Sequence, residues 1–223
     1  MRKYKVNEDY FKFIDTEEKA YWLGFLYADG CVTQATKYSK RLQVNLSIKD
    51  IDHLEILRKN LESTSGIREF LNDSSKQGFG KSMQCRLTVN SNKLCSDLED
   101  KGCKQAKTNS ASIPKVSKMF LKHFVRGLID GDGSFSMIPR KQYSGYRVQF
   151  ELVGNSLELI EFVKSYFSEN GINTKIYTRK TNNTKRLITS STKEISKIFE
   201  LLYKDSNIHL QRKYDKIKKK YTI

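Results

Sequence analysis

The chain contains one ten-residue pattern twice, and this repeat constrains its fold more than any other feature. Tyr21–Gly30 has the sequence YWLGFLYADG and Phe124–Gly133 has FVRGLIDGDG, with glycine at the fourth place and Asp-Gly at the end of each. Asp29 and Asp132 lie 103 positions apart in a chain of 223 residues. Self-similarity at this spacing predicts two copies of one structural unit.

The elements predicted after the two copies follow the same order. After the first motif helix, we predict strands at 31–35 and 41–49, a helix at 52–62 with Asp50 as its N-cap, strands at 67–71 and 82–90, and a helix at 93–101 ended by Gly102. After the second, we predict strands at 134–140 and 146–153, a helix at 157–169, strands at 174–179 and 186–190, a helix at 193–203 and a basic helix at 211–220. Alternation, as in the run of Met83, Cys85, Leu87 and Val89, indicates strands with one buried face.

This order predicts an α+β protein made of two pseudo-symmetric αββαββα halves, each with an antiparallel sheet that has one polar face. We expect an N-terminal half at 1–103, a linker at 104–116 that contains Pro114, and a C-terminal half at 117–223.

The two motif helices carry matching stripes of small residues. The stripes are formed by Ala20, Gly24 and Ala28 in the first helix, and by His123, Gly127 and Gly131 in the second. Small residues four positions apart let two helix backbones approach closely. We therefore expect the helices to lie side by side, with Asp29 and Asp132 at the same end of the crossing.

Two carboxylates at such a crossing repel each other, and two helix C-termini add partial negative charge and free carbonyls. A hard divalent cation would compensate, because Mg²⁺ binds a few carboxylate or carbonyl oxygens and keeps waters beside substrate phosphates. The expected ligands are Asp29, Asp132 and the carbonyls of Ala28 and Gly131. Such a metal can polarise a phosphodiester and activate a water. A single Asp-Gly after a helix is an ordinary turn, so the repetition carries this interpretation; the glycines are expected to allow a sharp exit into a strand.

The charge of the chain predicts a polyanionic partner. Lysine and arginine number 41 against 25 acidic residues, which gives a net charge of +16. A membrane partner is disfavoured, because no segment pairs a basic face with a long apolar one. The cysteines are scattered and are expected to be reduced and mostly buried thiols, typical of an intracellular protein without a targeting signal. We expect a bacterial or phage cytoplasm before an organelle. A basic structural protein would explain the charge but not the doubled motif.

The polar faces of the alternating strands predict a surface that reads DNA bases. Arginine suits guanine, and glutamine or asparagine suits adenine. In the first half the expected contacts are Arg41, Gln43, Asn45, Ser47, Lys49, Gln84, Arg86 and Thr88. In the second half they are Arg147, Gln149, Lys175, Tyr177, Arg179, Lys185 and Arg186. A solvated strand face is the alternative for any one of these residues.

Both motifs resemble the nine-residue signature of the LAGLIDADG homing endonucleases, at Trp22–Gly30 and Val125–Gly133. The resemblance implies motif helices at a central interface and two sheets that form a saddle across DNA. It also implies cleavage of both strands of a long, asymmetric double-stranded site, with 3′ overhangs, 5′ phosphates and Asp29 and Asp132 as the catalytic acids. Mg²⁺ or Mn²⁺ would support cleavage, and Ca²⁺ would support binding without it. Because the halves differ in sequence, one chain is expected to act as a monomer.

The sixth position of the signature and two lysines also bear on the resemblance. The sixth position of the signature is commonly acidic, which Asp130 satisfies and Tyr27 does not. Single-chain members also carry a late basic residue in each half that orders water around the phosphate. Lys107 and Lys213 are the candidates here, with ordinary solvated or phosphate-facing lysines as the open alternative.

Two functions on this fold remain open at the level of sequence. One is an intron-encoded endonuclease. The other is a non-cleaving binding protein, such as a maturase that assists the folding of intron RNA. The presence of both carboxylates favours the endonuclease, because a pure binder has no chemical use for two mutually repelling acids.

Overall fold

The computed structural model describes residues 4–75, 78, 80–103, 113, 116–139, 146–179 and 183–219. The first half contains α1 (Glu17–Asp29), β1 (Gly30–Thr36), β2 (Ser39–Ser47), the short 3₁₀ helix η1 (Ile48–Asp50), α2 (Ile51–Asn60), β3 (Arg68–Asp73), β4 (Lys81–Asn90) and α3 (Asn92–Asp100). The second contains η3 (Lys118–Phe120), α4 (Leu121–Asp132), β5 (Gly133–Pro139), β6 (Tyr146–Gly154), α5 (Leu157–Glu169), β7 (Lys175–Thr178), β8 (Lys185–Thr189) and α6 (Thr192–Tyr203), followed by α7 (Gln211–Lys218). The predicted order of helices and strands is confirmed.

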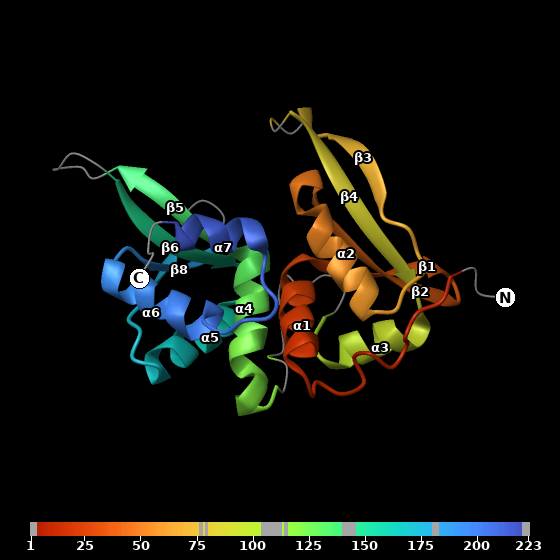
Figure 1. Ribbon diagram of the computed structural model, residues 1–223, viewed down its shortest axis with the longest axis horizontal. Coiled ribbons are helices and arrows are strands. Elements are labelled where there is room, and N and C mark those ends of the chain that lie inside the picture. Colours follow the sequence, from red (N-terminus) through yellow and green to blue (C-terminus); the bar gives the residue numbers. More distant parts are fainter. Residues whose placement is uncertain are drawn as a thin grey trace.

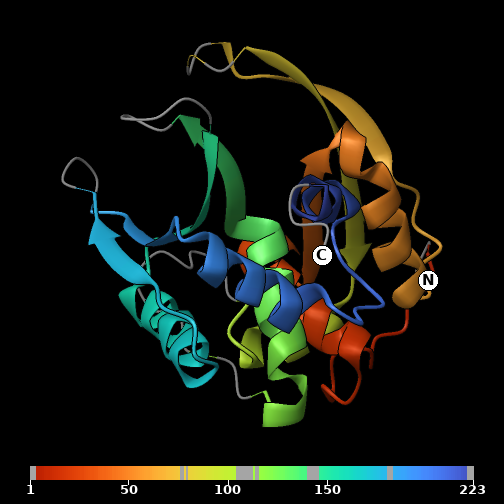
Figure 2. The same ribbon diagram turned by 60° about the vertical axis from the view of Figure 1, so that its left-hand side comes forward.

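The two halves share one sheet topology. Each has a four-stranded antiparallel sheet, in the orders β1-β2-β4-β3 and β5-β6-β8-β7. The registers also match, because the row that starts at Gly30 runs through Val44 to Leu87, and the row that starts at Gly133 runs through Leu152 to Leu187. The α+β fold with two pseudo-symmetric halves is therefore confirmed. Figures 1 and 2 show α1 and α4 at the centre, with the ends of β3–β4 and β5–β6 extending away from the helices on one side.

Alternating residues of each sheet form the core of that half. In the first half, Leu42, Val44 and Leu87 are almost fully buried with Leu54 and Leu57 of α2. In the second half, the corresponding buried set is Phe150, Leu152, Leu187, Ile160, Val163 and Ile195. Burial of these apolar side chains is the main driving force for each half.

The prediction that Met83 shares the buried face of β4 is wrong in its burial. Met83 is 44% exposed, whereas Cys85 on the same face is fully buried. Figure 1 shows the outer ends of β3 and β4 extending beyond α2, so no helix covers the sheet there.

The closest contact between the halves is the crossing of α1 and α4. A Cβ atom on Gly24 would lie 2.0 Å from the carbonyl oxygen of Phe124, and one on Gly127 would lie 2.0 Å from that of Tyr21. The two glycines therefore put the backbone of each helix directly against the other. This confirms the close approach that the small-residue stripes predict.

Side chains and glycines set the ends of several helices, and Gly102 ends α3 as predicted. Ser91, Ser156 and Ser191 accept hydrogen bonds from the first turns of α3, α5 and α6. Gly102 has φ +93°, a left-handed conformation that favours glycine after a helix. Asp50 departs from the prediction, because it precedes α2 but its side chain does not cap that helix.

Among the described residues, arginine–carboxylate ion pairs also join the halves. The guanidinium of Arg126, in α4, lies 2.6 Å from Glu17 in the first turn of α1. Asp50 instead binds Arg212 of α7, which donates through Nε and Nη2 at 3.0 and 2.9 Å. The chain end therefore returns from the second half onto the first.

No helix in the described part of the chain is long and apolar enough to cross a membrane.

Candidate active site and nucleic-acid interface

Asp29 and Asp132 are the last residues of α1 and α4, and both side chains are exposed. The crossing places them at the same end of the two helices. A Cβ atom on Gly131, the residue before Asp132, would lie 3.4 Å from Oδ2 of Asp29. The carboxylate of Asp29 therefore lies directly against the last turn of α4, beside the residue that carries the second carboxylate.

Gly30 and Gly133 follow the aspartates and begin β1 and β5. Their φ angles are −79° and −80°, which any residue adopts. The reason for glycine is space, since a Cβ atom would lie 2.5 Å from the carbonyl oxygen of Leu26 or 2.6 Å from that of Ile129. The predicted sharp exit is present, but close packing on the last helical turn requires the glycines, not a special dihedral angle.

Lys213, in α7, occupies the C-terminal end of α4. Its Nζ donates to the carbonyl oxygens of Ile129, Asp130, Gly131 and Gly133 at distances of 3.2, 2.5, 2.9 and 2.6 Å. Burial lowers the pKa of this amine, and the negative charges of Asp130, Asp29 and Asp132 oppose that shift. A partly buried cation thus stabilises the helix end and lies within electrostatic range of both exposed aspartates.

The donors at this end of the crossing fit a hard divalent ion that keeps most of its water. Two exposed carboxylates supply oxygen ligands of the kind that Mg²⁺ prefers. Nowhere in the described residues do three His, Cys, Asp or Glu side chains gather to hold a metal. Of the carbonyls expected as ligands, that of Gly131 accepts a hydrogen bond from Lys213. Lys107, the other candidate lysine, lies outside the described residues.

The third aspartate of the motif, Asp130, is 1% exposed and serves a different purpose. Oδ2 accepts hydrogen bonds from Oη of Tyr21 at 2.8 Å and from the backbone N–H of Leu210 at 2.7 Å, and Oδ1 accepts from Tyr203 at 2.7 Å. Burial raises the pKa of Asp130, against the effect of these bonds and of Lys213. Since all three partners are donors, the arrangement suits the ionised carboxylate.

The buried network continues into the first half through His53. Its Nε2 lies 2.9 Å from Oη of Tyr21. Because the Tyr21 hydroxyl hydrogen goes to Asp130, His53 must donate from Nε2. Burial lowers the pKa of His53 to about 4, which keeps the ring neutral at neutral pH.

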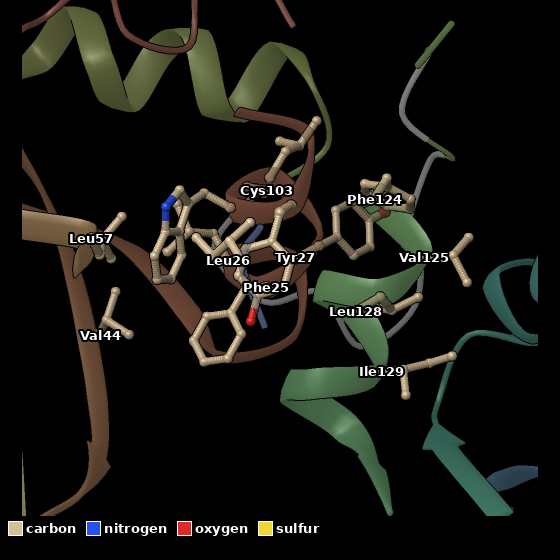
Figure 3. Close-up of a cluster of buried hydrophobic side chains, with 14 of the residues drawn as sticks. Phe25, Leu26, Tyr27, Val44, Leu57, Cys103, Phe124, Val125, Leu128 and Ile129 are labelled. Atoms are coloured by element: carbon tan, nitrogen blue, oxygen red, sulfur yellow. The ribbon is translucent and has the colours of Figure 1, made fainter. Parts of the chain in front are cut away.

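Tyr27 stands where the first motif lacks the acidic residue that Asp130 supplies in the second. Its ring packs edge-on against Phe124 of α4, with ring centroids 6.0 Å apart. Figure 3 shows it between Phe124 and Cys103, the residue that follows α3. Burial raises the pKa of Tyr27 to about 12. In this half, an aromatic ring packed against α4 stands in the place of the carboxylate.

The polar residues predicted on the first sheet share its open face. Their positions alternate with the buried residues, and the set is Arg41, Gln43, Asn45, Ser47, Gln84, Arg86 and Thr88. Arg86 donates to Oδ1 of Asn45 at 2.7 Å and lies 4.6 Å from the ring centroid of Phe70. Lys49 departs from the prediction, because β2 ends at Ser47 and Lys49 lies in η1.

Sequence reasoning missed part of this face. Arg68 lies opposite Arg86, and Phe70 lies opposite Gln84. Thr33 lies opposite Arg41 and accepts a hydrogen bond from it. The signal for β3 was weak because its alternation puts few apolar residues on either side. The cysteines are mostly buried, as expected: Cys85, Cys95 and Cys103 are buried, and Cys31 of β1 is exposed.

The second sheet presents a similar face with one difference. Arg147, Gln149, Glu151 and Arg186 lie on it, with Lys175 and Tyr177 of β7; Arg179 directly follows β7. Glu151 accepts hydrogen bonds from Arg186, one of them at 2.9 Å, so an acid partly neutralises this face. Lys185 precedes Arg186 in β8 and therefore lies on the opposite face, where it donates to Thr178 and Asn183. Its placement on the reading face was wrong.

Comparison with known proteins gives one family and several similar structures. Residues 119–203 match the model of the LAGLIDADG-like domain. The fold is similar to that of the I-LtrWI LAGLIDADG homing endonuclease bound to target DNA, with 15% identity, a TM-score of 0.63, and 97% of this chain and 91% of that one covered. It is also similar to I-SmaMI bound to cleaved DNA, with 15% identity, a TM-score of 0.61, and 89% of this chain and 85% of that one covered. I-GzeII in complex with its DNA target has 14% identity and a TM-score of 0.60, with 89% of this chain and 87% of that one covered. No curated protein sequence matches the chain.

Proposed function

We propose that the chain is a site-specific DNA endonuclease of the LAGLIDADG type, an interpretation supported by its fold and by the LAGLIDADG-like domain matched in its second half. It cuts both strands of a long, asymmetric double-stranded site by hydrolysis of phosphodiester bonds. It acts as a monomer, with a different half-site under each sheet. The observation that carries this proposal is the pair of exposed aspartates at one end of the glycine crossing, beside the ammonium of Lys213.

Each part of the site has its own task in this proposal. At Gly24 and at Gly127, the backbone of each motif helix lies against the backbone of the other helix. These contacts hold Asp29 and Asp132 at a fixed separation. Mg²⁺ or Mn²⁺, bound by the two carboxylates, would supply charge for the phosphate oxygens and lower the pKa of an attacking water. Lys213 adds a fixed positive charge, but all its N–H groups are directed at carbonyls, so it stabilises charge and does not carry protons.

The open faces of the sheets would select the DNA. Polar side chains on them can reach base edges in the major groove, while lysines at the rim bind phosphate. Similar folds have been determined in complex with DNA targets, which supports double-stranded DNA as the partner. A gene inside an intron would place the target at the rejoined junction of the interrupted host gene. A maturase on the same fold would bind intron RNA and keep no use for the paired acids.

The proposal is tested by cleavage of a DNA fragment in which the two sequences that flank the reading frame in the genome are joined directly. We expect double-strand breaks in Mg²⁺, and binding without breaks in Ca²⁺. Asp29→Asn and Asp132→Asn should each reduce cleavage by at least about a thousandfold and leave the affinity in Ca²⁺ within about threefold. The control is Asp205→Asn, which removes the same charge from an exposed position outside the site and should cut normally. Cleavage that persists in either motif variant would contradict the paired-aspartate site.

A further inference from the structure

Helix α7 brings Lys213 to the proposed active site, and its own position depends on very few polar contacts. Arg212 binds Asp50 of the first half, and Lys213 binds the end of α4. Both residues lie in the first turn of α7, so the place where this helix begins decides where both side chains reach. Leu210 is the residue at which α7 begins, as its N-cap.

Leu210 has both of its backbone groups engaged. Its carbonyl oxygen accepts hydrogen bonds from the N–H groups of Lys213 at 2.9 Å and Tyr214 at 3.1 Å, which form the first turn of α7. Its N–H donates to Oδ2 of Asp130 at 2.7 Å. One residue therefore connects a buried carboxylate of α4 directly to the first turn of the helix that carries Lys213.

From this arrangement we propose that Asp130 is a positioning residue: its carboxylate fixes the start of α7 and thereby holds Lys213 at the aspartate pair. The inference rests on the proposed function for its consequence in cleavage, but the anchoring of α7 can be measured without any cleavage. Asp130 lies two residues before Asp132 in the same helix, so one helix end provides the exposed carboxylate of the site and fixes the lysine beside it.

The geometry of the carboxylate supports this role. A charged acceptor binds a backbone N–H more strongly than a neutral one does, and negative charge at a helix N-terminus is favourable. The tyrosine hydroxyls of Tyr21 and Tyr203 hold the carboxylate from α1 and α6. Asp130 is thereby fixed from both halves, and its carboxylate is joined to the N-cap of α7 through the N–H of Leu210.

The equivalent position of the first half gives an independent comparison. Tyr27 takes the place of Asp130 there and lies beside Cys103, which follows α3 as the segment up to Leu210 follows α6. In both halves, this position of the motif helix contacts the chain after the third helix. In the second half, this contact is the hydrogen bond from the N–H of Leu210 to the carboxylate of Asp130, and it leads into the helix that carries Lys213.

The first test measures amide hydrogen exchange in Asp130→Asn. The amide oxygen can serve either Oδ site but not both, and the charge is lost. We expect exchange in α7 to accelerate by at least about tenfold, while α1 and α5 keep their protection. The matched control is Tyr203→Phe, which removes the donor at Oδ1 and leaves the bond between Oδ2 and Leu210. Unchanged protection of α7 in Asp130→Asn, or equal loss in every helix, would overturn the proposal.

A second pair of variants tests the same bond if Asp130→Asn does not fold. Leu210→Pro and Leu210→Ala both shorten a buried side chain, but only proline lacks the N–H that reaches Asp130. The φ of Leu210 is −76°, which proline adopts without strain. We expect α7 to exchange at least about tenfold faster in the proline variant than in the alanine variant. Equal exchange in both would overturn the role of this bond.

The consequence for cleavage is tested by a double-mutant cycle with Lys213→Met. If Asp130 acts through Lys213, each single variant slows single-turnover cleavage, and the double variant is no slower than Lys213→Met. Effects that multiply would show that Asp130 acts elsewhere. A wild-type chain that cuts none of its DNA would contradict the proposed function, while the exchange data would still decide whether Asp130 anchors α7.

Discussion

At the scale of single residues, the second motif shows how one residue type acquires two tasks. Asp130 and Asp132 are separated by one glycine, yet Asp130 is 1% exposed and surrounded by donors, whereas Asp132 faces solvent at the helix end. The helical turn directs one carboxylate into the interface and the other away from it. Sequence placed both at a helix end, but the partners of Asp130 lie 73 to 109 positions away along the chain, beyond the reach of local patterns.

The buried histidines predict how stability depends on pH. His53 has a pKa of about 4 in the folded protein against an ordinary value of 6.5, so unfolding takes up a proton between these values. This contribution to stability is complete above pH 6.5 and is lost as the pH falls toward 4. His123, whose pKa burial also lowers to about 4, adds a slope of the same sign.

Chemical denaturation between pH 7 and 4 checks this prediction. Near pH 5 we expect His53→Gln to reduce the slope of unfolding free energy against pH by about 1 kcal/mol per pH unit. Glutamine retains an N–H for Tyr21 but does not titrate. A slope equal to that of the wild type would show that His53 is not neutral when buried.

At the scale of helices and strands, periodicity predicted most of the fold. The bounds of α5 are those expected, and the other elements differ by a few residues at their ends. Two of the predictions that failed depend on neighbours: Met83 is exposed because α2 does not cover that end of the sheet, and Asp50 binds Arg212 instead of capping α2. The third depends on alternation, because Lys185 precedes Arg186 in β8 and therefore lies on the other face.

The crossing of α1 and α4 gives the prediction that belongs to this scale. Gly24→Ala would place a Cβ atom against the backbone of α4, and this backbone cannot move aside as a flexible side chain could. We expect a loss of about 1–3 kcal/mol or more in unfolding free energy, together with slower cleavage, because the aspartates move apart. Gly66→Ala is the control, since no atom lies within 4 Å of its added Cβ. Equal stability of the two variants in urea unfolding would contradict the close packing.

At the scale of the whole molecule, pseudo-symmetry places two arginines at equivalent points of the proposed DNA-reading surface. Arg86 directly precedes Leu87, which lies in the row of paired residues that starts at Gly30. Arg186 directly precedes Leu187, which lies in the equivalent row that starts at Gly133. Asn45 holds the first and Glu151 holds the second. The halves therefore share a position for arginine although the residues around it differ.

This equivalence predicts guanines at equal distances from the centre of the target. Arg86→Ala should relax the preference in one half-site and Arg186→Ala in the other, each by about 1–3 kcal/mol. Binding of a library of substituted targets measures both preferences. Lys185→Ala, next to Arg186 but on the opposite face, should leave the preference unchanged. Preferences at unrelated distances from the centre would contradict the symmetric placement.

The contacts between the two halves also limit how the halves can be recombined. Three pairs join them: Glu17 with Arg126, Tyr21 with Asp130, and Asp50 with Arg212. If one member of a pair is lost, the other is left as a buried or partly buried charge or hydroxyl without its partner. A hybrid that joins one half to a foreign partner inherits only one side of each pair. In such a protein, by evolution or by engineering, the matching residues must travel with the half that carries them.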